Sequence, residues 1–90
     1  MSGAQKPYRD LTEVSEVEDI MREDGPAAVL DFWSETCGPC RAMAPAFEAV
    51  AGQFDDDEVL FCKINTTRNG NLAAPFNIRS VPTILFVHKG

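Results

Sequence analysis

Residues 31–47, DFWSETCGPCRAMAPAF, contain two cysteines with only two residues between them, and this stretch decides how the chain is interpreted. Cys37 and Cys40 enclose Gly38 and Pro39. An apolar run precedes the pair, and apolar residues at helical spacing follow it. The stretch therefore predicts a buried strand that ends just before the cysteines and a helix that begins at them.

A C-x-x-C pair allows three interpretations, and this sequence favours a redox pair. A structural zinc site needs two further cysteine or histidine ligands. Only Cys62 and His88 remain, and both fall in predicted strands at a spacing unsuited to such a site. An inert pair of small apolar side chains is the third interpretation. Zinc stays an alternative that metal analysis of the purified protein would settle.

The composition fits one small domain and argues against several classes of partner. The 90 residues are 44% hydrophobic and carry a formal net charge of −6. Nucleic acids and anionic membrane surfaces bind basic patches, whereas the eight lysines and arginines of this chain are scattered singly. No apolar stretch approaches the roughly 18 residues of a membrane span. We therefore expect neither nucleic-acid binding nor membrane binding.

The N-terminus and the number of cysteines suggest a reducing compartment. Residues 1–9 are polar and lack the apolar segment of a secretory signal. A disulfide-stapled secreted domain would normally carry a larger, even number of cysteines than the three present here. We therefore expect a cytoplasmic protein.

Hydrophobic periodicity predicts strands that alternate with helices. Nearly continuous apolar runs indicate buried parallel strands, and apolar residues three or four positions apart indicate the buried face of a helix. The expected strands are 8–11, 27–33, 59–64 and 83–87; the expected helices are 12–23 with Thr12 or Ser15 as N-cap, one that begins at the cysteines with Met43, Phe47, Val50, Ala51 and Phe54 on one face, and 71–76. This alternation predicts an α/β fold. We expect residues 1–7 to form a flexible lead-in to a domain over residues 8–90.

The place of the cysteines between a strand and a helix favours thiol–disulfide exchange. Unpaired backbone N–H groups and the positive end of the helix dipole stabilise a thiolate at Cys37. Cys40 lies three residues further along the same helical face, one turn deeper and within disulfide reach. Cys37 is therefore the predicted nucleophile, and Cys40 is the thiol that resolves the mixed disulfide.

Two charged residues, Asp31 and Lys63, stand in predicted buried strands, where an unpaired charge is costly. In neighbouring parallel strands both side chains can point to one face of the sheet and pair there. Alternation along the strand then points Cys62 to the opposite face. We interpret Cys62 as a buried apolar residue and not as a third redox thiol.

Beyond the cysteine pair, the chain resembles the thioredoxin family. The matching stretches, in the family's order and with closely similar spacing, are VLDFW at 29–33, TCGPCRAMAP at 36–45, KIN at 63–65 and IRSVPT at 78–83. The match runs from about residue 11 to residue 90. It implies a three-layer fold, a central mixed sheet flanked by helices, and protein dithiol–disulfide exchange without a bound cofactor. It also implies disulfide-containing substrate proteins and reducing equivalents from an NADPH-dependent thioredoxin reductase.

The resemblance implies roles for residues beneath and beside the cysteines. Asp31 would accept the proton of Cys40 and is thus a candidate general acid/base, with Lys63 beside it. A purely structural buried pair is the alternative. Trp33 matches the family's tryptophan that packs against the active-site loop, and simple core packing is the alternative there.

The resemblance also implies a substrate-binding surface. In the family, the proline that matches Pro82 is cis and faces the cysteines, and the residue before it binds the substrate backbone as an added strand. These roles fall to Val81, Pro82 and Thr83, although from sequence alone Pro82 is a strand-entry proline. Gly38 and Pro39 belong to the same surface. Strongly oxidising relatives carry a histidine between the cysteines, so Gly-Pro favours reduction over oxidation.

One residue at the site departs from the family pattern. Thr36 precedes the nucleophile where thioredoxins usually carry a second tryptophan. The change removes an aromatic surface beside the sulfur, and it affects partner docking more than the chemistry. A non-catalytic binding module that uses the groove around Pro82 is therefore the alternative function.

Three other features receive no chemical role. His88 lies near the end of the last strand and is interpreted as solvated. The acidic run 55–58 lacks the alternating ligands and glycine of a calcium loop, so a solvated turn is the better interpretation. Arg41 is placed to help hold a thiolate at Cys37, but an exposed helix position explains it equally well.

The chain stops where thioredoxins continue with one more strand and a final helix. We expect both elements to be missing from the fold, which leaves strand 83–87 at the sheet edge. Even a few hundred Å² of exposed apolar surface costs several kcal/mol at ~25 cal/mol per Å². The sequence therefore predicts either a homo-oligomer formed through that strand and face, or a shortened and marginally stable form.

Overall fold

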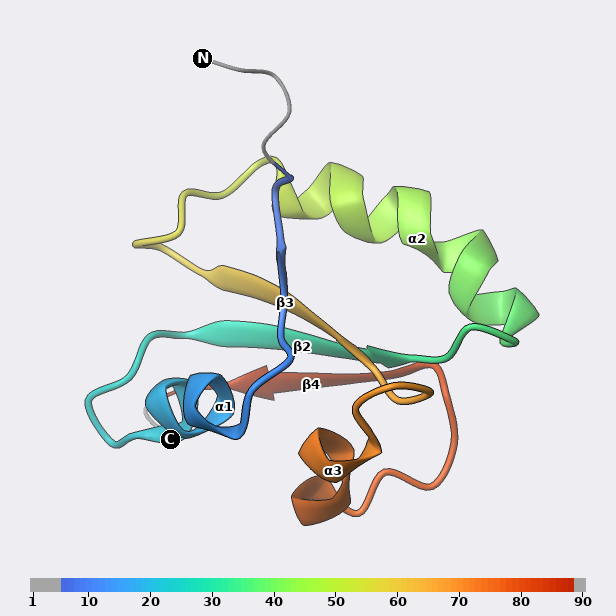
Figure 1. Ribbon diagram of the computed structural model, residues 1–90. Coiled ribbons are helices and arrows are strands. Elements are labelled where there is room, and N and C mark those ends of the chain that lie inside the picture. Colours follow the sequence, from blue (N-terminus) through green and yellow to red (C-terminus); the bar gives the residue numbers. More distant parts are fainter. Residues whose placement is uncertain (1–5, 89–90) are drawn as a thin grey trace.

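The computed structural model describes residues 6–88, which form a four-stranded sheet with helices on both faces (Figure 1). The strands, in the spatial order β1-β3-β2-β4, are β1 (Arg9–Asp10), β2 (Ala28–Trp33), β3 (Leu60–Asn65) and β4 (Thr83–Val87). β3 pairs in parallel with both β1 and β2, whereas β4 pairs antiparallel with β2. The predicted α/β fold with a mixed sheet is confirmed. Most of the expected flexible segment 1–7 lies outside the described residues.

The helices differ from the expected ones mainly at their ends. They are α1 (Val14–Met21), α2 (Gly38–Ala51) and α3 (Gly70–Ala73), and a 3₁₀ turn, Ala74–Phe76, follows α3. Neither predicted N-cap of α1 is correct, because the N-cap is Glu13. The Glu16 carboxylate accepts the backbone N–H groups of Thr12 and Glu13, at 2.9 and 3.0 Å, which closes the helix start. Among residues 6–88, no helix is both long and apolar enough to cross a bilayer.

The sheet separates two apolar cores, which gives the three layers that the sequence predicts. One core lies under α1 and α3 and contains Leu30, Phe32, Cys62 and Ile64 from the sheet. The other lies under α2 and contains Val29, Phe47, Ala51 and Phe61. Alternate residues of β2 and β3 point into different cores, because successive side chains of a strand face opposite sides.

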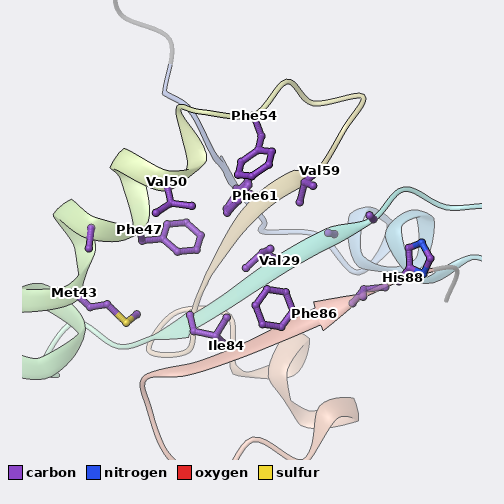
Figure 2. A pocket seen from close by; sticks show the side chains of 14 residues that line it. Val29, Met43, Phe47, Val50, Phe54, Val59, Phe61, Ile84, Phe86 and His88 are labelled. Atoms are coloured by element: carbon purple, nitrogen blue, oxygen red, sulfur yellow. The ribbon is translucent and has the colours of Figure 1, made fainter.

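Part of the α2 face stays open to solvent. Met43, Phe47, Val50, Ala51 and Phe54 were expected to share one buried face, yet Val50 and Phe54 are 46% and 42% exposed. They border a hollow of about 540 Å³ that extends over β4 to Phe86, which is 81% exposed (Figure 2). Within residues 6–88 no element covers this part of the sheet, since β4 forms its edge. We call these exposed residues and the hollow the apolar face.

The same sheet brings three loops together at one edge. β2 and β3 are parallel, so the loops that follow them, 34–37 and 66–69, meet at the carboxyl end of the sheet. β4 is antiparallel, so the loop that precedes it, 77–82, reaches the same end. The start of α2, which carries Cys37 and Cys40, lies at this end of the sheet, which we call the active-site edge (Figure 1).

Candidate active site

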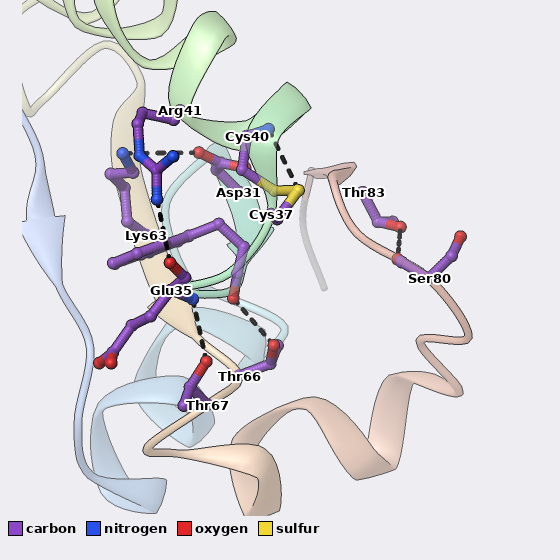
Figure 3. Close-up of a disulfide and its surroundings, with 11 residues drawn as sticks. Asp31, Glu35, Cys37, Cys40, Arg41, Lys63, Thr66, Thr67, Ser80 and Thr83 are labelled. Atoms are coloured by element: carbon purple, nitrogen blue, oxygen red, sulfur yellow. Dashed lines mark hydrogen bonds and ion pairs between the residues drawn. A yellow bond between two sulfur atoms is a disulfide. The ribbon is translucent and has the colours of Figure 1, made fainter.

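Cys37 and Cys40 form a disulfide at the start of α2 (Figure 3). Their Cα atoms are 5.3 Å apart. Cys37 is the N-cap of α2, and the backbone N–H of Cys40 donates to its Sγ at 3.1 Å. Cys40 is only 5% exposed and Cys37 is half-buried, as expected for a resolving thiol beneath an accessible nucleophile. The N–H groups that open a helix favour negative charge on the Cys37 sulfur once the disulfide is reduced.

Asp31 and Lys63 meet beneath the disulfide, as predicted from their places in two buried strands. Their Cα atoms are partners in the β2–β3 register, and Lys63 Nζ lies 3.9 Å from one carboxylate oxygen of Asp31. Asp31 is 2% exposed and its other oxygen, Oδ1, has no hydrogen-bond partner among the described residues. Burial raises the pKa of Asp31, and the Lys63 charge offsets this only in part. Asp31 is therefore poised to hold a proton more readily than an exposed aspartate.

Aromatic rings surround the Lys63 ammonium, a feature that the sequence did not predict. Nζ lies 5.2 Å from the ring centroid of Tyr8, 5.3 Å from that of Trp33 and 5.7 Å from that of Phe47. These three rings come from the segment before β1, the end of β2 and the middle of α2. Cation–π attraction helps to hold a charge that would otherwise be costly to bury. Because the ring contacts join distant segments, no local sequence signal reveals them.

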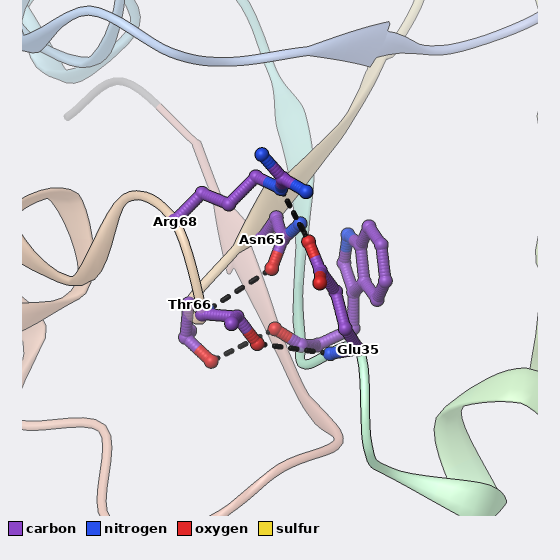
Figure 4. Close-up of polar contacts among 6 residues, drawn as sticks. Glu35, Asn65, Thr66 and Arg68 are labelled. Carbon is purple, nitrogen blue, oxygen red and sulfur yellow. Dashed lines mark hydrogen bonds and ion pairs between the residues drawn. The ribbon is translucent and has the colours of Figure 1, made fainter.

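A polar network ties the loop before the cysteines to the loop after β3 (Figure 4). The Glu35 carboxylate accepts from Asn65 Nδ2 at 2.9 Å and from Arg68 Nε. The Glu35 N–H donates to Thr67 Oγ1 at 2.9 Å. The carbonyl oxygen of Trp33 accepts from both the N–H and the hydroxyl of Thr66, at 2.7 and 2.8 Å. This network fixes the backbone that leads from β2 to Cys37.

Hydrogen bonding from Asn65 and Arg68 holds the pKa of Glu35 below its usual value. The carboxylate is thus ionised when it pairs with Arg68. The sequence analysis missed this network. A signal existed, because Glu35 and Asn65 stand at or just beyond the ends of neighbouring parallel strands, and such ends meet at one edge of a sheet.

The loop before β4 lies across from the disulfide. The Val81–Pro82 peptide bond is cis, as the resemblance implied. The Thr83 hydroxyl donates to the carbonyl oxygen of Ser80 at 2.6 Å, which closes the turn. Figure 3 shows the Ser80–Thr83 segment on the side of the disulfide opposite Arg41. Val81 and Pro82 are half-buried, so part of each remains open to a partner.

Three further residues, Trp33, Gly38 and Pro39, have a substrate-binding role that the resemblance implies. Gly38 and Pro39 are exposed in the first turn of α2. Trp33 is half-buried at the end of β2, and its Nε1 has no hydrogen-bond partner among the described residues. Arg41 is exposed, and its Nη2 donates to the carbonyl oxygen of Glu35 at 3.1 Å.

The residues without a predicted role lie away from the disulfide chemistry. Cys62 is fully buried in the core under α1 and α3, and burial raises the pKa of its thiol to about 12. His88 is exposed and borders the apolar face. The acidic run 55–58 is an exposed turn. Within residues 6–88, no three His, Cys, Asp or Glu side chains cluster as metal ligands.

The mixed sheet and the C-x-x-C disulfide at a helix start define a dithiol–disulfide oxidoreductase. The family model for thioredoxin matches residues 10–90, and the chain belongs to the thioredoxin family. It is 42% identical to Thioredoxin C-3 of Corynebacterium nephridii over 80 residues, which cover 89% of this chain and 53% of that protein. It is 38% identical to the thioredoxin of Rhodospirillum rubrum over 82 residues, which cover 91% of this chain and 77% of that protein.

Solved structures agree with the sequence relatives. The thioredoxin of Malassezia sympodialis superposes with a TM-score of 0.84 at 26% identity, and the match covers all of this chain and 77% of that one. The chain thus spans about half of one relative and about three quarters of the other two.

Proposed function

We propose that this protein reduces disulfides of substrate proteins by thiol–disulfide exchange. The observation that carries the proposal is the Cys37–Cys40 disulfide at the start of α2, with Cys40 buried above Asp31. In the reduced protein, the Cys37 thiolate attacks one sulfur of the substrate disulfide. A mixed disulfide forms and one substrate thiolate leaves.

Cys40 completes the exchange. Its thiolate attacks Cys37 Sγ, which breaks the mixed disulfide, releases the second substrate thiolate and forms the Cys37–Cys40 disulfide. Two electrons pass from the protein to the substrate, and both substrate thiolates take protons. Cys40 is buried, so its thiol needs a nearby base to lose its proton. Asp31 is that base, because burial already favours its protonated form. Lys63 steadies the carboxylate through the ion pair.

The substrate chain lies in the groove beside the disulfide. Val81 offers its backbone for strand-like hydrogen bonds, and Pro82 and Thr83 border the same surface. Trp33 lines the same cavity as Cys37 and Cys40, and the exposed Gly38 and Pro39 separate the two cysteines. No further cofactor is needed, because the disulfide itself carries the electrons. An NADPH-dependent thioredoxin reductase would restore the dithiol, and a reducing compartment such as the cytoplasm suits this cycle.

Reduction of insulin driven by dithiothreitol tests the proposal. The chain should accelerate precipitation of the insulin B chain, and Cys37→Ser should remove the acceleration. If the unmodified chain gives no acceleration yet binds substrate proteins, then the groove serves a non-catalytic binding module. In that case Thr36→Trp would be the first substitution to test, because thioredoxins usually carry tryptophan at this position.

A further inference from the structure

Charge is distributed unevenly between the two ends of the sheet. The three segments at the active-site edge, 33–41, 65–70 and 76–83, contain three arginines and one glutamate. The rest of the chain contains five lysines and arginines and thirteen aspartates and glutamates. The active-site edge is therefore positive in a chain whose formal net charge is −6.

Two of the three arginines have no carboxylate partner within residues 6–88. Arg68 pairs with Glu35, and the two charges neutralise each other. Arg41 donates only to a backbone carbonyl, and neither Arg41 nor Arg79 forms a salt bridge there. Both side chains belong to exposed residues. Their charges are thus available to a partner.

These two arginines flank the place where a substrate disulfide must bind. Arg41 lines a cavity of about 360 Å³ together with Cys37 and Cys40. Four other charged residues line this cavity, and each has a partner of opposite charge. Lys6 and Asp10 pair with each other at 3.0 Å, Lys63 pairs with Asp31, and Glu35 pairs with Arg68. Arg79 lines a second cavity, of about 330 Å³, together with Val81. Figure 3 shows Arg41 on one side of the disulfide and the loop that follows Arg79 on the other.

We propose that Arg41 and Arg79 select substrate proteins whose reducible disulfide is flanked by acidic residues. The proposal rests on the disulfide reductase function and narrows its substrate class. Guanidinium groups bind carboxylates with two parallel hydrogen bonds, which fixes orientation as well as charge. An acidic side chain on each side of the substrate disulfide would meet one arginine each, while Cys37 attacks the sulfur between them.

The acidic remainder of the chain does not cancel this preference. Six acidic residues lie in the loops before β2 and β3, namely Glu23, Asp24, Asp55, Asp56, Asp57 and Glu58. β2 has six residues, and at ~3.3 Å per residue these loops lie about 20 Å from the active-site edge. The Debye length is ~8 Å at physiological salt, so the distant acidic charges are screened while the arginines act at contact. At low salt, the acidic loops repel an acidic partner and the arginines attract it, so the partner approaches with its acidic side toward the active-site edge.

Three disulfide peptides of one length test the preference. They share a central disulfide loop and differ only in the two flanking residues on each side, which are Glu, Gln or Lys. Stopped-flow measurement gives the second-order rate constant for reduction of each peptide by the reduced protein, at ~20 mM and ~300 mM salt. The Glu peptide should react about 10-fold faster than the Lys peptide at low salt. The ratio should shrink at high salt.

Variants separate a specific role of the arginines from general electrostatics. The double variant Arg41→Gln with Arg79→Gln should bring the Glu-to-Lys rate ratio close to one. Arg41→Lys keeps the charge but loses the paired hydrogen bonds of the guanidinium, so it should keep only part of the ratio. Arg22→Gln removes an exposed arginine outside the active-site edge and should leave the ratio unchanged.

The outcomes distinguish this proposal from the reductase function. Equal rates for the Glu and Lys peptides at low salt would overturn the substrate preference and leave the reductase function intact. A preference that survives in the double variant would overturn the assignment to these arginines. Failure to reduce even the Gln peptide would instead contradict the reductase function.

Discussion

The active-site edge and the apolar face lie on the same small sheet, yet they are built by opposite means. At the active-site edge, hydrogen bonds and an ion pair join the segment after β2 to the segment after β3 (Figures 3 and 4). Across the apolar face, Phe86, Val50 and Phe54 expose large side chains. Among residues 6–88, His88 is the only ionisable side chain that borders the hollow (Figure 2).

The two regions depend on different non-covalent interactions. Hydrogen bonds are directional, so a network of them holds the cysteines in one geometry relative to Asp31 and the groove. Apolar contact is non-directional and roughly proportional to the area removed from water. Substitutions at the apolar face should therefore change association and stability, whereas substitutions at the active-site edge should change the rate of disulfide exchange. Substitutions in the two regions should separate these properties.

The largest effect is expected from the two cysteines at the active-site edge. Cys40→Ser leaves Cys37 able to attack but removes the thiol that releases the substrate. Mixed disulfides with substrate proteins should therefore accumulate, while multiple-turnover reduction falls to the background rate. Non-reducing gel electrophoresis after incubation with an oxidised substrate protein detects the trapped species.

Cys37→Ser is the matched control for this experiment. It retains a buried thiol at Cys40 and should trap nothing. Trapping by Cys37→Ser and not by Cys40→Ser would reverse the assignment of nucleophile and resolving thiol.

The next effect concerns Asp31 and the rate of reduction. Asp31→Asn removes the base that takes the proton of Cys40. Reduction should slow by about 10- to 100-fold near neutral pH. This factor lies at or below the low end of what a general base contributes to a rate, because a water molecule can replace the Asp31 carboxylate in part. The loss should shrink as pH rises toward the pKa of a free thiol. A pH profile of single-turnover reduction measures it, and an unchanged profile would leave Asp31 with a structural role only.

The same substitution should change stability with a defined sign. The pKa of Asp31 in the folded protein lies above its ordinary value of 3.8, so the folded state binds this proton more tightly than the unfolded chain. The free energy of unfolding therefore decreases as pH rises from about 4 through the native pKa. Asp31→Asn should raise stability by about 1–3 kcal/mol at pH 7 and by little at pH 3. Denaturant unfolding at both pH values gives the difference.

Lys63→Met is the matched control for stability. It removes the cation that offsets the burial of Asp31, and it should lower stability at pH 7. A lower stability of Asp31→Asn at pH 7 would mean that the Lys63 ion pair, at 3.9 Å, outweighs the desolvation of the carboxylate.

The contrast between the two regions also explains what the sequence could predict. Pairing of Asp31 with Lys63, burial of Cys62 on the other face and the half-exposed Cys37 all follow from strand alternation and from the place of one helix start. These are properties of single elements and their nearest neighbours. The Glu35 network and the rings around Lys63 join segments about 16 to 55 residues apart, so they depend on tertiary placement that no local pattern encodes.

At the apolar face, sequence analysis predicted burial that the structure does not show. Val50 and Phe54 have the spacing of a buried helix face, and that spacing alone predicts burial. Whether a side chain is buried depends also on what lies opposite. In residues 6–88, part of the α2 face looks over β4 toward solvent. Helical periodicity identifies the face and does not supply its partner.

At the apolar face the expected effect is on association and not on the rate of reduction. Phe86 is 81% exposed at the edge of the described sheet, and its burial between two copies would yield about 2–3 kcal/mol. We expect the chain to self-associate, and Phe86→Lys to weaken association roughly 30- to 150-fold, because lysine also disfavours pairing of edge strands. Sedimentation equilibrium at several concentrations measures the change. Insulin reduction per chain should stay the same.

Val14→Lys provides a matched control for Phe86. Val14 is 49% exposed on α1, on the other side of the sheet, and its replacement should leave association unchanged. Self-association through this face would be contradicted if the unmodified chain sediments as a monomer at every concentration and melts cooperatively at high temperature.

The smallest effect is expected from Glu35, which holds the loop before the cysteines without touching them. Glu35→Gln keeps the shape of the side chain and one acceptor oxygen but removes the charge that pairs with Arg68. The pKa of Glu35 is lowered in the folded protein, so its stabilising contribution is present above its ordinary pKa and is lost as pH falls through the native value. The melting temperatures of Glu35→Gln and the unmodified chain should thus differ slightly at pH 7 and converge near pH 3. Amide hydrogen exchange of Glu35, whose N–H donates to Thr67, should quicken severalfold in the variant at pH 7. Unchanged exchange would show that the two hydrogen bonds that Thr66 donates to the Trp33 carbonyl suffice to hold the loop.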